Sequence, residues 1–347
     1  MGTWRSVMTF PTALSYDDVL LVPQYSDIVS RKEVDLSSAL DDQRTLSLPI
    51  ISSPMDTITE SAMANAMSAA GGLGIIHRYN SIEMQAQQAY EVKNTSSKAA
   101  AIGITGDYLD RASALYESGV RILCLDVAHG HHILMKKAIS NIRNLYDDVH
   151  IMAGNVATKK GFEDLANWGA DSIRCNIGSG SICSTRIQTG HGMPGLQTIF
   201  ECFTADITRD VKIIADGGLK NSGDIVKALA AGADFVMVGS LLSGTSETPG
   251  DVIYAADGTR RKIYRGMASK EAQHDWRGKH SSNEGVSTTV YAKGTANDIL
   301  KDLDNGIRSG LSYSGARDIL ELQMKSEFIL QTTSGQSESK THILFRK

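Results

Sequence analysis

The sequence predicts an α/β protein whose fold class is a closed (β/α)8 TIM barrel, a single domain with long loops at the carboxyl ends of its strands. Two observations predict this fold. Short apolar segments alternate with helical stretches along about 200 residues, which is typical of βαβ units and a parallel sheet. Eight such segments recur, mostly about 22 to 29 residues apart, and this number favours a sheet closed into a barrel. An open doubly wound sheet is the alternative, weakened because no G-x-G-x-x-G turn follows the first strand.

The expected strands are short, apolar and followed by glycine or polar residues. They span 48–52, 73–76, 99–104, 121–125, 150–153, 172–175, 211–215 and 235–238. A helix rich in alanine and methionine begins after Thr59 and Glu60 and is stopped by Gly71 and Gly72. Further helices are expected at 108–118, 159–168 and 223–231.

The chain divides around this repeat. Residues 1–48 form a lead-in with a short extended segment at 14–23, and 49–244 hold the eight βα units. A polar flap insertion, 245–292, is expected to lack regular structure, as functional loops often do. A closing segment, 293–333, and a polar tail without structure, 334–347, complete the single domain.

Composition narrows the class of protein. The 347 residues carry a net charge of −4 with a pI near 6.1, which gives no electrostatic basis for binding nucleic acid or an anionic membrane. No apolar run approaches the roughly 18 residues that a membrane span needs, and residues 1–10 do not form a secretory signal. The four cysteines form no C-x-x-C pair, so free thiols and a cytoplasmic location are expected.

Polar residues follow most of the strands, where a barrel places its active site. They are Ser53, Asp126, His129, Asn155, Asp216 and Ser240, the last of which follows Gly239. Each alone is better explained as a loop-capping residue, but together these residues equip only one face of the barrel. The turns at Asp216-Gly217-Gly218 and Gly239-Ser240 end strands seven and eight, which commonly bind phosphate in barrels. A phosphorylated substrate is therefore expected, with Asp216 able to accept hydrogen bonds from ribose hydroxyls.

The longest gap between strands, 176–210, contains a glycine-rich stretch around Cys183. A thiol in such a loop becomes a nucleophile when a neighbouring base or a lowered pKa makes it a thiolate. Thr185 and Glu284, from the insertion, are candidates for moving the proton. The structural alternatives are a buried cysteine, which behaves as a small apolar residue, and a solvated loop glutamate.

These residues make the sequence similar to the IMP dehydrogenase/GMP reductase family over most of its length. The matching segments agree in order and spacing: YDDVLLVP (16–23), SPMDT (53–57), GNV (154–156), GSGSICSTR (178–186), ADGG (215–218), GS (239–240), YRGM (264–267) and GA (315–316).

The resemblance implies residue roles. Cys183 attacks C2 of the purine nucleotide, Thr185 and Glu284 handle protons, and hydride passes between C2 and a nicotinamide cofactor. The nucleotide is held by Ser53, Asp216, Gly217, Gly218, Gly239, Ser240 and Tyr264, and its base is read around Gly266, Met267 and Ala268. The nicotinamide side is faced by Asp126, Ala128, His129, Gly130 and Asn155. The carbonyls of Gly178, Gly180 and Cys183 match a monovalent-cation (potassium) loop, although Asn176 and Ser179 replace the usual glycine and proline. A homotetramer is also implied.

The family catalyses two reactions, and the sequence favours one. A regulatory module of roughly 120 residues, usual after the second strand in the dehydrogenases, is absent. The insertion also lacks the Arg-Tyr pair with which dehydrogenases activate water. Both features favour reduction of GMP to IMP and ammonia by NADPH. The alternative is oxidation of IMP to XMP with NAD. The segment 264–267 is more similar to the dehydrogenases, and Arg277 would take the role of the arginine missing from the Arg-Tyr pair. A flavin-binding barrel and a non-catalytic nucleotide-binding relative are further alternatives.

Overall fold

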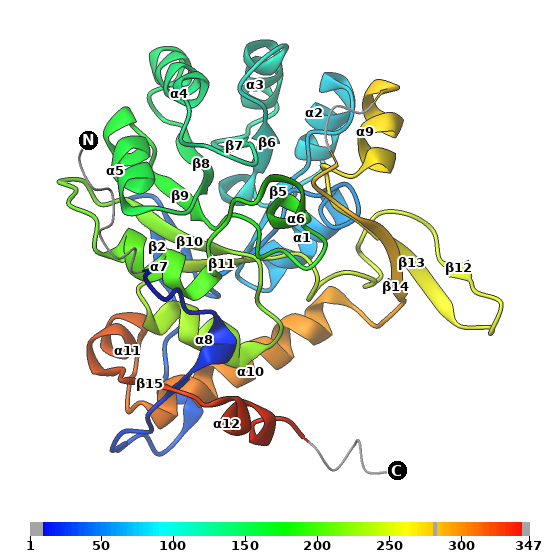
Figure 1. The fold of residues 1–347 in the computed structure, drawn as a ribbon. Helices are drawn as coiled ribbons and strands as arrows, with labels where there is room; N and C mark the ends of the chain where they lie inside the picture. The colour runs from blue at the N-terminus through cyan, green and yellow to red at the C-terminus, as the bar shows by residue number, and fades with distance from the viewer. Residues whose placement is uncertain (1–9, 280–282, 342–347) are drawn as a thin grey trace, which may run out of the picture.

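The structure, a computed structural model, describes residues 10–279 and 283–341. Its centre is a closed barrel of eight parallel strands (Figure 1). These are β4 (Ile50–Ser52), β5 (Leu73–Ile76), β6 (Ala99–Ile102), β7 (Ile122–Asp126), β8 (His150–Val156), β9 (Ser172–Cys175), β10 (Lys212–Asp216) and β11 (Phe235–Val238). The prediction of a (β/α)8 barrel is confirmed, and β11 pairs with β4, so the open-sheet alternative is wrong.

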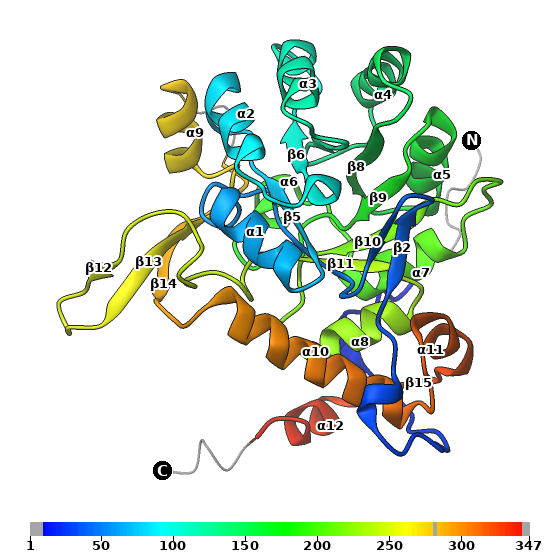
Figure 2. The ribbon, with the colours of Figure 1, turned by 180° about the vertical axis from the view of Figure 1, so that it is seen from behind.

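Helices surround the barrel in both ribbon views (Figures 1 and 2). They are α1 (Ser61–Ala69), α2 (Ile82–Tyr90), α3 (Tyr108–Glu117), α4 (Ile133–Leu145), α5 (Lys159–Trp168), α7 (Gly195–Phe203), α8 (Ser222–Ala230), α10 (Ala296–Tyr313) and α11 (Ile319–Lys325). Their ends follow local chemistry. In α5, the Thr158 side chain accepts a hydrogen bond from the Gly161 N–H, and Gly169 ends the helix at a φ of 111°.

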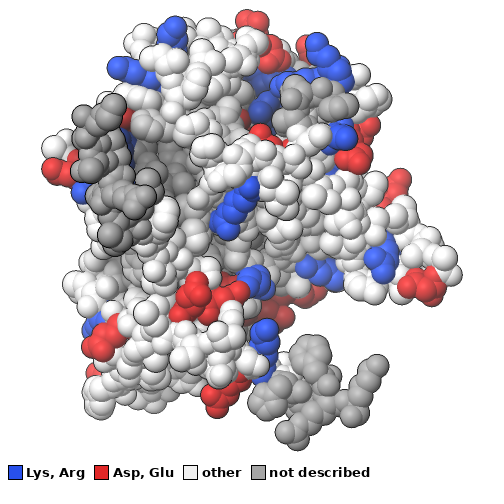
Figure 3. Space-filling view, viewed as in Figure 1, with Lys and Arg blue, Asp and Glu red and all other residues white. Residues whose placement is uncertain are grey.

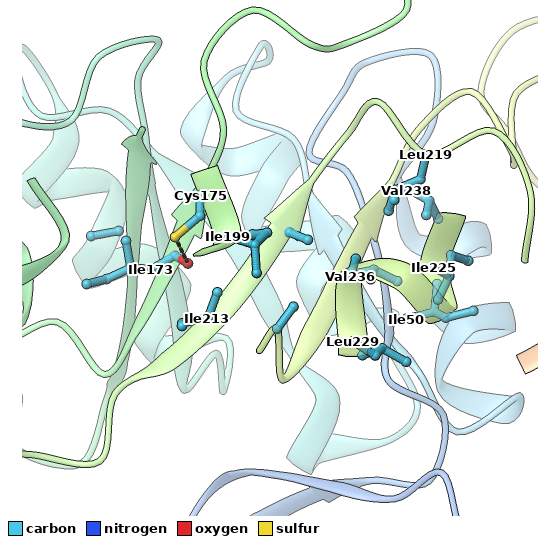
Figure 4. Close-up of a cluster of buried hydrophobic side chains, with 14 of the residues drawn as sticks. Ile50, Ile173, Cys175, Ile199, Ile213, Leu219, Ile225, Leu229, Val236 and Val238 are labelled. Carbon is cyan, nitrogen blue, oxygen red and sulfur yellow. Dashed lines mark hydrogen bonds between the residues drawn. The ribbon is translucent and has the colours of Figure 1, made fainter. Parts of the chain in front are cut away.

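The strands bury both of their faces, which explains their nearly continuous apolar sequences. Outward-facing side chains of β9, β10 and β11 pack against α7 and α8, where Ile199, Ile225 and Leu229 meet them (Figure 4). Inward-facing side chains form a second core inside the barrel: Ile51, Leu73, Ile75, Ala99, Ala101, Ile122, Cys124, Met152, Ile214, Phe235 and Met237. The barrel is therefore filled, and a ligand can enter only at one of its ends.

The amino end of the barrel is closed by a hairpin of β2 (Ser38–Asp41) and β3 (Arg44–Leu46). Leu40 and Leu46 from this hairpin belong to the interior core, and both are buried. The carboxyl end is thus the open one.

The hairpin is joined to the barrel by a chain of three polar side chains. His150, the first residue of β8, places Nδ1 3.0 Å from Asp41 Oδ2 and Nε2 2.8 Å from Ser172 Oγ. Serine, histidine and aspartate can form a nucleophilic triad. Here Ser172 has no exposed surface, so a substrate cannot reach it and the contact is structural. Burial would raise the pKa of the Asp41 carboxyl, but hydrogen bonds from His150, Gln43 and Arg44 outweigh it and hold that pKa below its usual range.

We expect Asp41→Asn to lower the free energy of unfolding by about 1.5–3 kcal/mol at neutral pH, the usual range for a hydrogen bond to a charged group. Because the folded-state pKa is depressed, this contribution is complete above the unfolded pKa of about 3.9 and is lost as pH falls toward the folded value. Urea unfolding of both proteins from pH 7 down to pH 2.5 measures it. Asp42→Asn, a change at the exposed neighbouring residue, is the control. If the difference in unfolding free energy between the wild type and Asp41→Asn stays constant over this pH range, the stabilising role of the Asp41 carboxylate is wrong.

The segments outside the barrel differ from expectation in two places. The insertion has regular structure: a three-stranded antiparallel sheet of β12 (Ile253–Tyr254), β13 (Arg260–Arg265) and β14 (Ser287–Tyr291), and helix α9 (Lys270–Arg277). The sheet projects to one side of the barrel (Figure 1). The tail also contains a helix, α12 (Thr333–Glu338), because the Thr332 side chain caps it by accepting from the Gly335 N–H. Residues 1–9, 280–282 and 342–347 of the lead-in, insertion and tail lie outside the described residues.

The lead-in and the closing segment pair with each other. Strand β1 (Val19–Leu21) forms an antiparallel pair with β15 (Phe328–Leu330), so a segment near the beginning of the described chain lies beside one near its end. Across 10–279 and 283–341, every helix is too short or too polar to cross a bilayer. On the face in Figure 3, acidic and basic side chains are interspersed on a mostly uncharged surface.

Candidate active site

A cavity of about 280 Å³ opens at the carboxyl ends of the barrel strands. Its size is at the lower end for a small-molecule site. Most of the residues singled out from the sequence line it: Ser53, Asp126, Ala128, Asn155, Gly178, Gly180, Cys183, Thr185, Asp216, Gly217, Gly218, Gly239, Ser240, Tyr264, Gly266, Met267, Ala268 and Glu284. They come from strand ends and from the insertion, so only the closed barrel brings them together.

Three of these side chains form a hydrogen-bonded relay. The Cys183 thiol donates to Thr185 Oγ1 at 3.1 Å, and the Thr185 hydroxyl donates to Glu284 Oε2 at 2.9 Å. Cys183 is partly exposed, whereas Cys124, Cys175 and Cys202 are buried. A nucleophile linked through a hydroxyl to a carboxylate has the arrangement needed to deliver and recover a proton during covalent chemistry.

The relay depends on backbone pairing between the Cys183 loop and the insertion. An isolated antiparallel bridge joins Cys183 to Gly285, and the Ser184 N–H donates to the Glu284 carbonyl at 3.0 Å. The Ser184 hydroxyl donates to the Asn283 carbonyl, and the Val286 N–H donates to the Ile182 carbonyl. These contacts fix Glu284 beside Thr185, although 99 residues separate them in the sequence.

The two turns expected to bind phosphate lie side by side. Gly217 and Gly218 have φ values of 79° and 76°, in the left-handed region that glycine tolerates. The Tyr264 hydroxyl, from β13, is 3.2 Å from Ser181 Oγ and also interacts with Ser240. Burial raises the pKa of Tyr264, which keeps the phenol as a neutral hydrogen-bonding group.

One buried arginine that the sequence did not single out lines the cavity. Arg174 lies inside the barrel on β9 and is 6% exposed. Its guanidinium reaches Asp126 Oδ1 at 2.5 Å and Asp216 Oδ2 at 2.8 Å. Burial raises the pKa of the Asp126 carboxyl, but the charges of Arg174 and Arg78 outweigh it, so that pKa lies below its usual range. An arginine within the otherwise apolar strand 172–175 was the available signal.

Helix α9 has no residue in the lining of the cavity and is joined to the barrel by two contacts. Trp276 stacks on Tyr79, which follows β5, with ring centroids 4.1 Å apart and an interplanar angle of 15°. Arg265 joins α9 to the first strand end, since it donates to Asp56 Oδ2 at 2.6 Å and to Asp275 Oδ2 at 2.6 Å. Both ribbon views show α9 beside α2 (Figures 1 and 2).

Two of the predicted cofactor residues do not line the cavity. His129 is exposed on the loop after β7, and partial desolvation of its ring together with the nearby histidines lowers its pKa. Gly130 is buried, and its N–H donates to the Asn155 carbonyl at 2.7 Å. A Cβ at Gly130 would lie 2.9 Å from the Gly154 carbonyl carbon, so this glycine permits close packing of two loops.

Neighbouring groups contact the backbone of the predicted cation loop. The Gly180 carbonyl accepts a hydrogen bond from the Cys183 N–H at 3.0 Å. The Arg186 side chain packs against Gly178, and its guanidinium donates to Ser179 Oγ at 2.7 Å. Binding of a monovalent cation by the carbonyls of Gly178, Gly180 and Cys183 stays a prediction. Among the described residues, no group of three or more His, Cys, Asp or Glu side chains could hold a metal ion.

The structure is a closed (β/α)8 barrel in which a cysteine, a hydroxyl and a carboxylate are linked by hydrogen bonds at the open end. Residues 13–342 match the family model of the IMP dehydrogenase / GMP reductase domain. The chain belongs to this family, whose members are oxidoreductases acting on purine nucleotides with a nicotinamide cofactor.

The relatives carry both names of the family. Inosine-5′-monophosphate dehydrogenase from Nitrosopumilus maritimus is 33% identical, covering 96% of this chain and 99% of its own length. The enzyme of the same name from Cryptosporidium parvum is 36% identical, covering 95% and 94%. Among solved structures, the chain is similar to a GMP reductase from Trypanosoma brucei, with a TM-score of 0.91 and 31% identity. The match covers 96% of this chain and 98% of that one. That protein is a variant with one cysteine replaced by alanine, and its crystal structure is a complex with guanosine 5′-monophosphate.

Proposed function

We propose that this protein is a GMP reductase. It converts GMP, NADPH and a proton into IMP, NADP⁺ and ammonia, through a covalent bond between Cys183 Sγ and C2 of the purine. The observation that carries this proposal is the relay from Cys183 through Thr185 to Glu284, at 3.1 and 2.9 Å, within a cavity that opens beside two glycine turns suited to phosphate.

The relay accounts for the protons of the reaction. When Cys183 Sγ adds to C2, its thiol proton passes along Thr185 toward Glu284, which is 2.9 Å from the threonine hydroxyl. Glu284 then returns a proton to the 2-amino group, so that it leaves as ammonia and not as an amide anion. A reduced nicotinamide, when bound, supplies the hydride to C2. The Cys183 thiolate then departs with the electron pair of the C–S bond, which leaves IMP and a thiolate that is reprotonated through the relay.

Polar groups around the relay support binding of a nucleotide and a dinucleotide. We infer that Ser53, Tyr264 and the turns at 217–218 and 239–240 hold the phosphate, and that Asp216 accepts the ribose hydroxyls. The backbone of Gly266, Met267 and Ala268 would then read the base. Asp126, Ala128 and Asn155 would face the nicotinamide half. NADPH as the cofactor, a homotetramer and a cytoplasmic location belong to the same proposal.

The choice of reductase rests on the insertion. Hydrolysis of a covalent intermediate requires an activated water, and the segment 268–283 contains no Arg-Tyr pair. The Arg277 guanidinium lies 3.9 Å from the centroid of the Trp276 ring, and Arg277 is not among the residues that line the cavity. It is therefore poorly placed to substitute for the missing base. The Trypanosoma brucei neighbour, named a GMP reductase and solved with GMP, also supports this choice.

Chain length does not distinguish the two reactions. The alignment to the Nitrosopumilus maritimus dehydrogenase spans 472 residues, so that relative has a long segment without a counterpart here. The alignment to the Cryptosporidium parvum dehydrogenase spans only 383 residues at similar coverage, so a dehydrogenase can have nearly the length of this chain. The expectation that a missing module favours the reductase is thus weakened. Oxidation of IMP with NAD remains the second candidate, favoured by the names of these relatives.

Absorbance at 340 nm distinguishes the two reactions. Purified protein is mixed with GMP and NADPH, and separately with IMP and NAD, in potassium-containing and potassium-free buffer. A decrease in the first mixture alone, with stoichiometric ammonia, is the expected result. An increase in the second mixture alone, with XMP formed, would establish the dehydrogenase and overturn the proposal.

A further inference from the structure

Arg174 connects two carboxylates that the proposed function assigns to two different ligands. The guanidinium Nη1 donates to Asp126 Oδ1, on β7, at 2.5 Å. Its Nε and Nη2 donate to Asp216 Oδ2, on β10, at 3.0 and 2.8 Å. Asp216 would bind the nucleotide ribose and Asp126 the dinucleotide, so one side chain lies between the two halves of the cavity.

The barrel is built to keep this guanidinium in place. Arg174 is 6% exposed, and a buried charge of this kind is stable only when it is paired and hydrogen-bonded. A Cβ on Gly154, in β8, would lie 2.6 Å from Arg174 Cβ, so glycine provides the space for the arginine stem. Asn155 Nδ2 also donates to Asp216 Oδ2 at 2.7 Å, which holds the carboxylate from a third strand.

The hydrogen bonds leave part of each carboxylate available. Asp216 Oδ2 receives three hydrogen bonds, whereas Asp216 Oδ1 receives none from the described residues. Asp126 Oδ2 is 3.6 Å from Arg78 Nε, a distance too long for a good hydrogen bond. Arg78 Nε is buried without a hydrogen-bond partner. The Asp216 carboxylate is therefore held by several hydrogen bonds, whereas the hydrogen-bonding capacity of Asp126 and Arg78 is less completely used.

We propose that Arg174 is a positioning residue that couples binding of the nucleotide to binding of the dinucleotide. This inference rests on the proposed assignment of Asp216 and Asp126 to the two ligands. A ribose hydroxyl that binds Asp216 restricts that carboxylate and, through it, the guanidinium shared with Asp126. The second ligand then meets an Asp126 that is already ordered, and its binding costs less conformational entropy. The coupling is favourable, and linkage makes it equal in both directions.

Equilibrium binding of GMP and NADP⁺, a pair that cannot react in the proposed direction, measures the coupling without turnover. In the wild type, saturating NADP⁺ should tighten GMP binding about five- to tenfold, within the usual range for coupled sites. Arg174→Met should weaken the binding of each ligand and reduce this coupling factor to about one. Arg174→Lys should restore part of the coupling. Arg143→Met is the control, because Arg143 pairs with Asp171 at the opposite end of the barrel.

A structural role for Arg174 predicts a different pattern. The proposal is wrong if Arg174→Met weakens the binding of both ligands but keeps the wild-type coupling factor. It is also wrong if the wild type shows no coupling. Asp126→Ala provides a second route should Arg174→Met fail to fold. It removes the oxygen that accepts from Arg174 Nη1, and with it one end of the bridge, and should abolish coupling while GMP alone binds within about twofold of wild type. A wild-type protein that fails to bind GMP, but binds IMP, would instead refute the proposed function; the coupling is then tested with IMP and NADH.

The pH dependence of NADP⁺ binding provides a second measurement of the role of Asp126. The charges of Arg174 and Arg78 hold the pKa of its carboxyl below the usual value of about 3.9. In the wild type, Asp126 should therefore add no pH dependence to NADP⁺ binding down to about pH 4, and the only change should come from the NADP⁺ 2′-phosphate, which titrates at about pH 6 and affects both proteins alike. In Arg174→Met one of these charges is lost while burial remains, so the pKa rises and NADP⁺ affinity should fall between about pH 6 and pH 4. Equal pH dependence in both proteins would count against the proposal.

Discussion

Cys183→Ala should lower kcat for conversion of the nucleotide by at least about a thousandfold, the scale seen when a covalent nucleophile is removed. The dissociation constant for GMP should change less than about threefold, because the proposed phosphate and base contacts come from other residues around the cavity. Steady-state absorbance at 340 nm measures kcat, and calorimetry measures binding to the same preparation.

Alkylation gives an independent check of the nucleophile. Cys183 is partly exposed while the other three cysteines are buried, so iodoacetamide should label it first, and GMP should protect it. Cys202→Ala, a change at a buried cysteine on α7, is the matched control and should retain turnover. Activity that survives in Cys183→Ala, or binding that disappears along with it, would make Cys183 a structural residue.

Glu284→Gln should lower kcat by about 100- to 10,000-fold, the range for loss of a general acid–base. Glutamine has nearly the same shape, and its amide oxygen can still accept the hydrogen bond from Thr185, which is 2.9 Å long in the wild type. It cannot take up the proton, so the relay keeps its geometry and loses its function. KM for GMP should change little, because the substitution affects the chemical step.

The control for Glu284→Gln lies in the same insertion. Glu271 is an exposed carboxylate on α9, so Glu271→Gln makes the same chemical change without touching the relay and should leave kcat near the wild-type value. Rapid-quench measurement of ammonia release locates the affected step. If Glu284→Gln retains more than about a fifth of wild-type kcat, the proton takes another route and the proposed role is wrong.

Much of the barrel could be predicted because its signals are local. A strand such as β9, Ser172–Cys175, lies where the apolar segment 172–175 predicts it, and α5 has the predicted bounds, Lys159–Trp168. Apolar runs, a threonine cap and a terminating glycine act over a few residues, so the sequence contains them directly. The sequence does not predict the strands of the insertion, because β13 and β14 pair across more than twenty residues and Gly285 forms a bridge with the distant Cys183. No short sequence window contains these partners.

The sequence by itself determined the fold class, the family resemblance and the identity of the thiol and its two candidate partners. Only the tertiary structure decided which side chains meet. It joined Cys183, Thr185 and Glu284 at hydrogen-bonding distance, left His129 outside the cavity, and put Arg174 between Asp126 and Asp216. The physical reason is that a hydrogen bond or ion pair depends on separation in space, and barrel closure sets that separation for residues far apart in the chain.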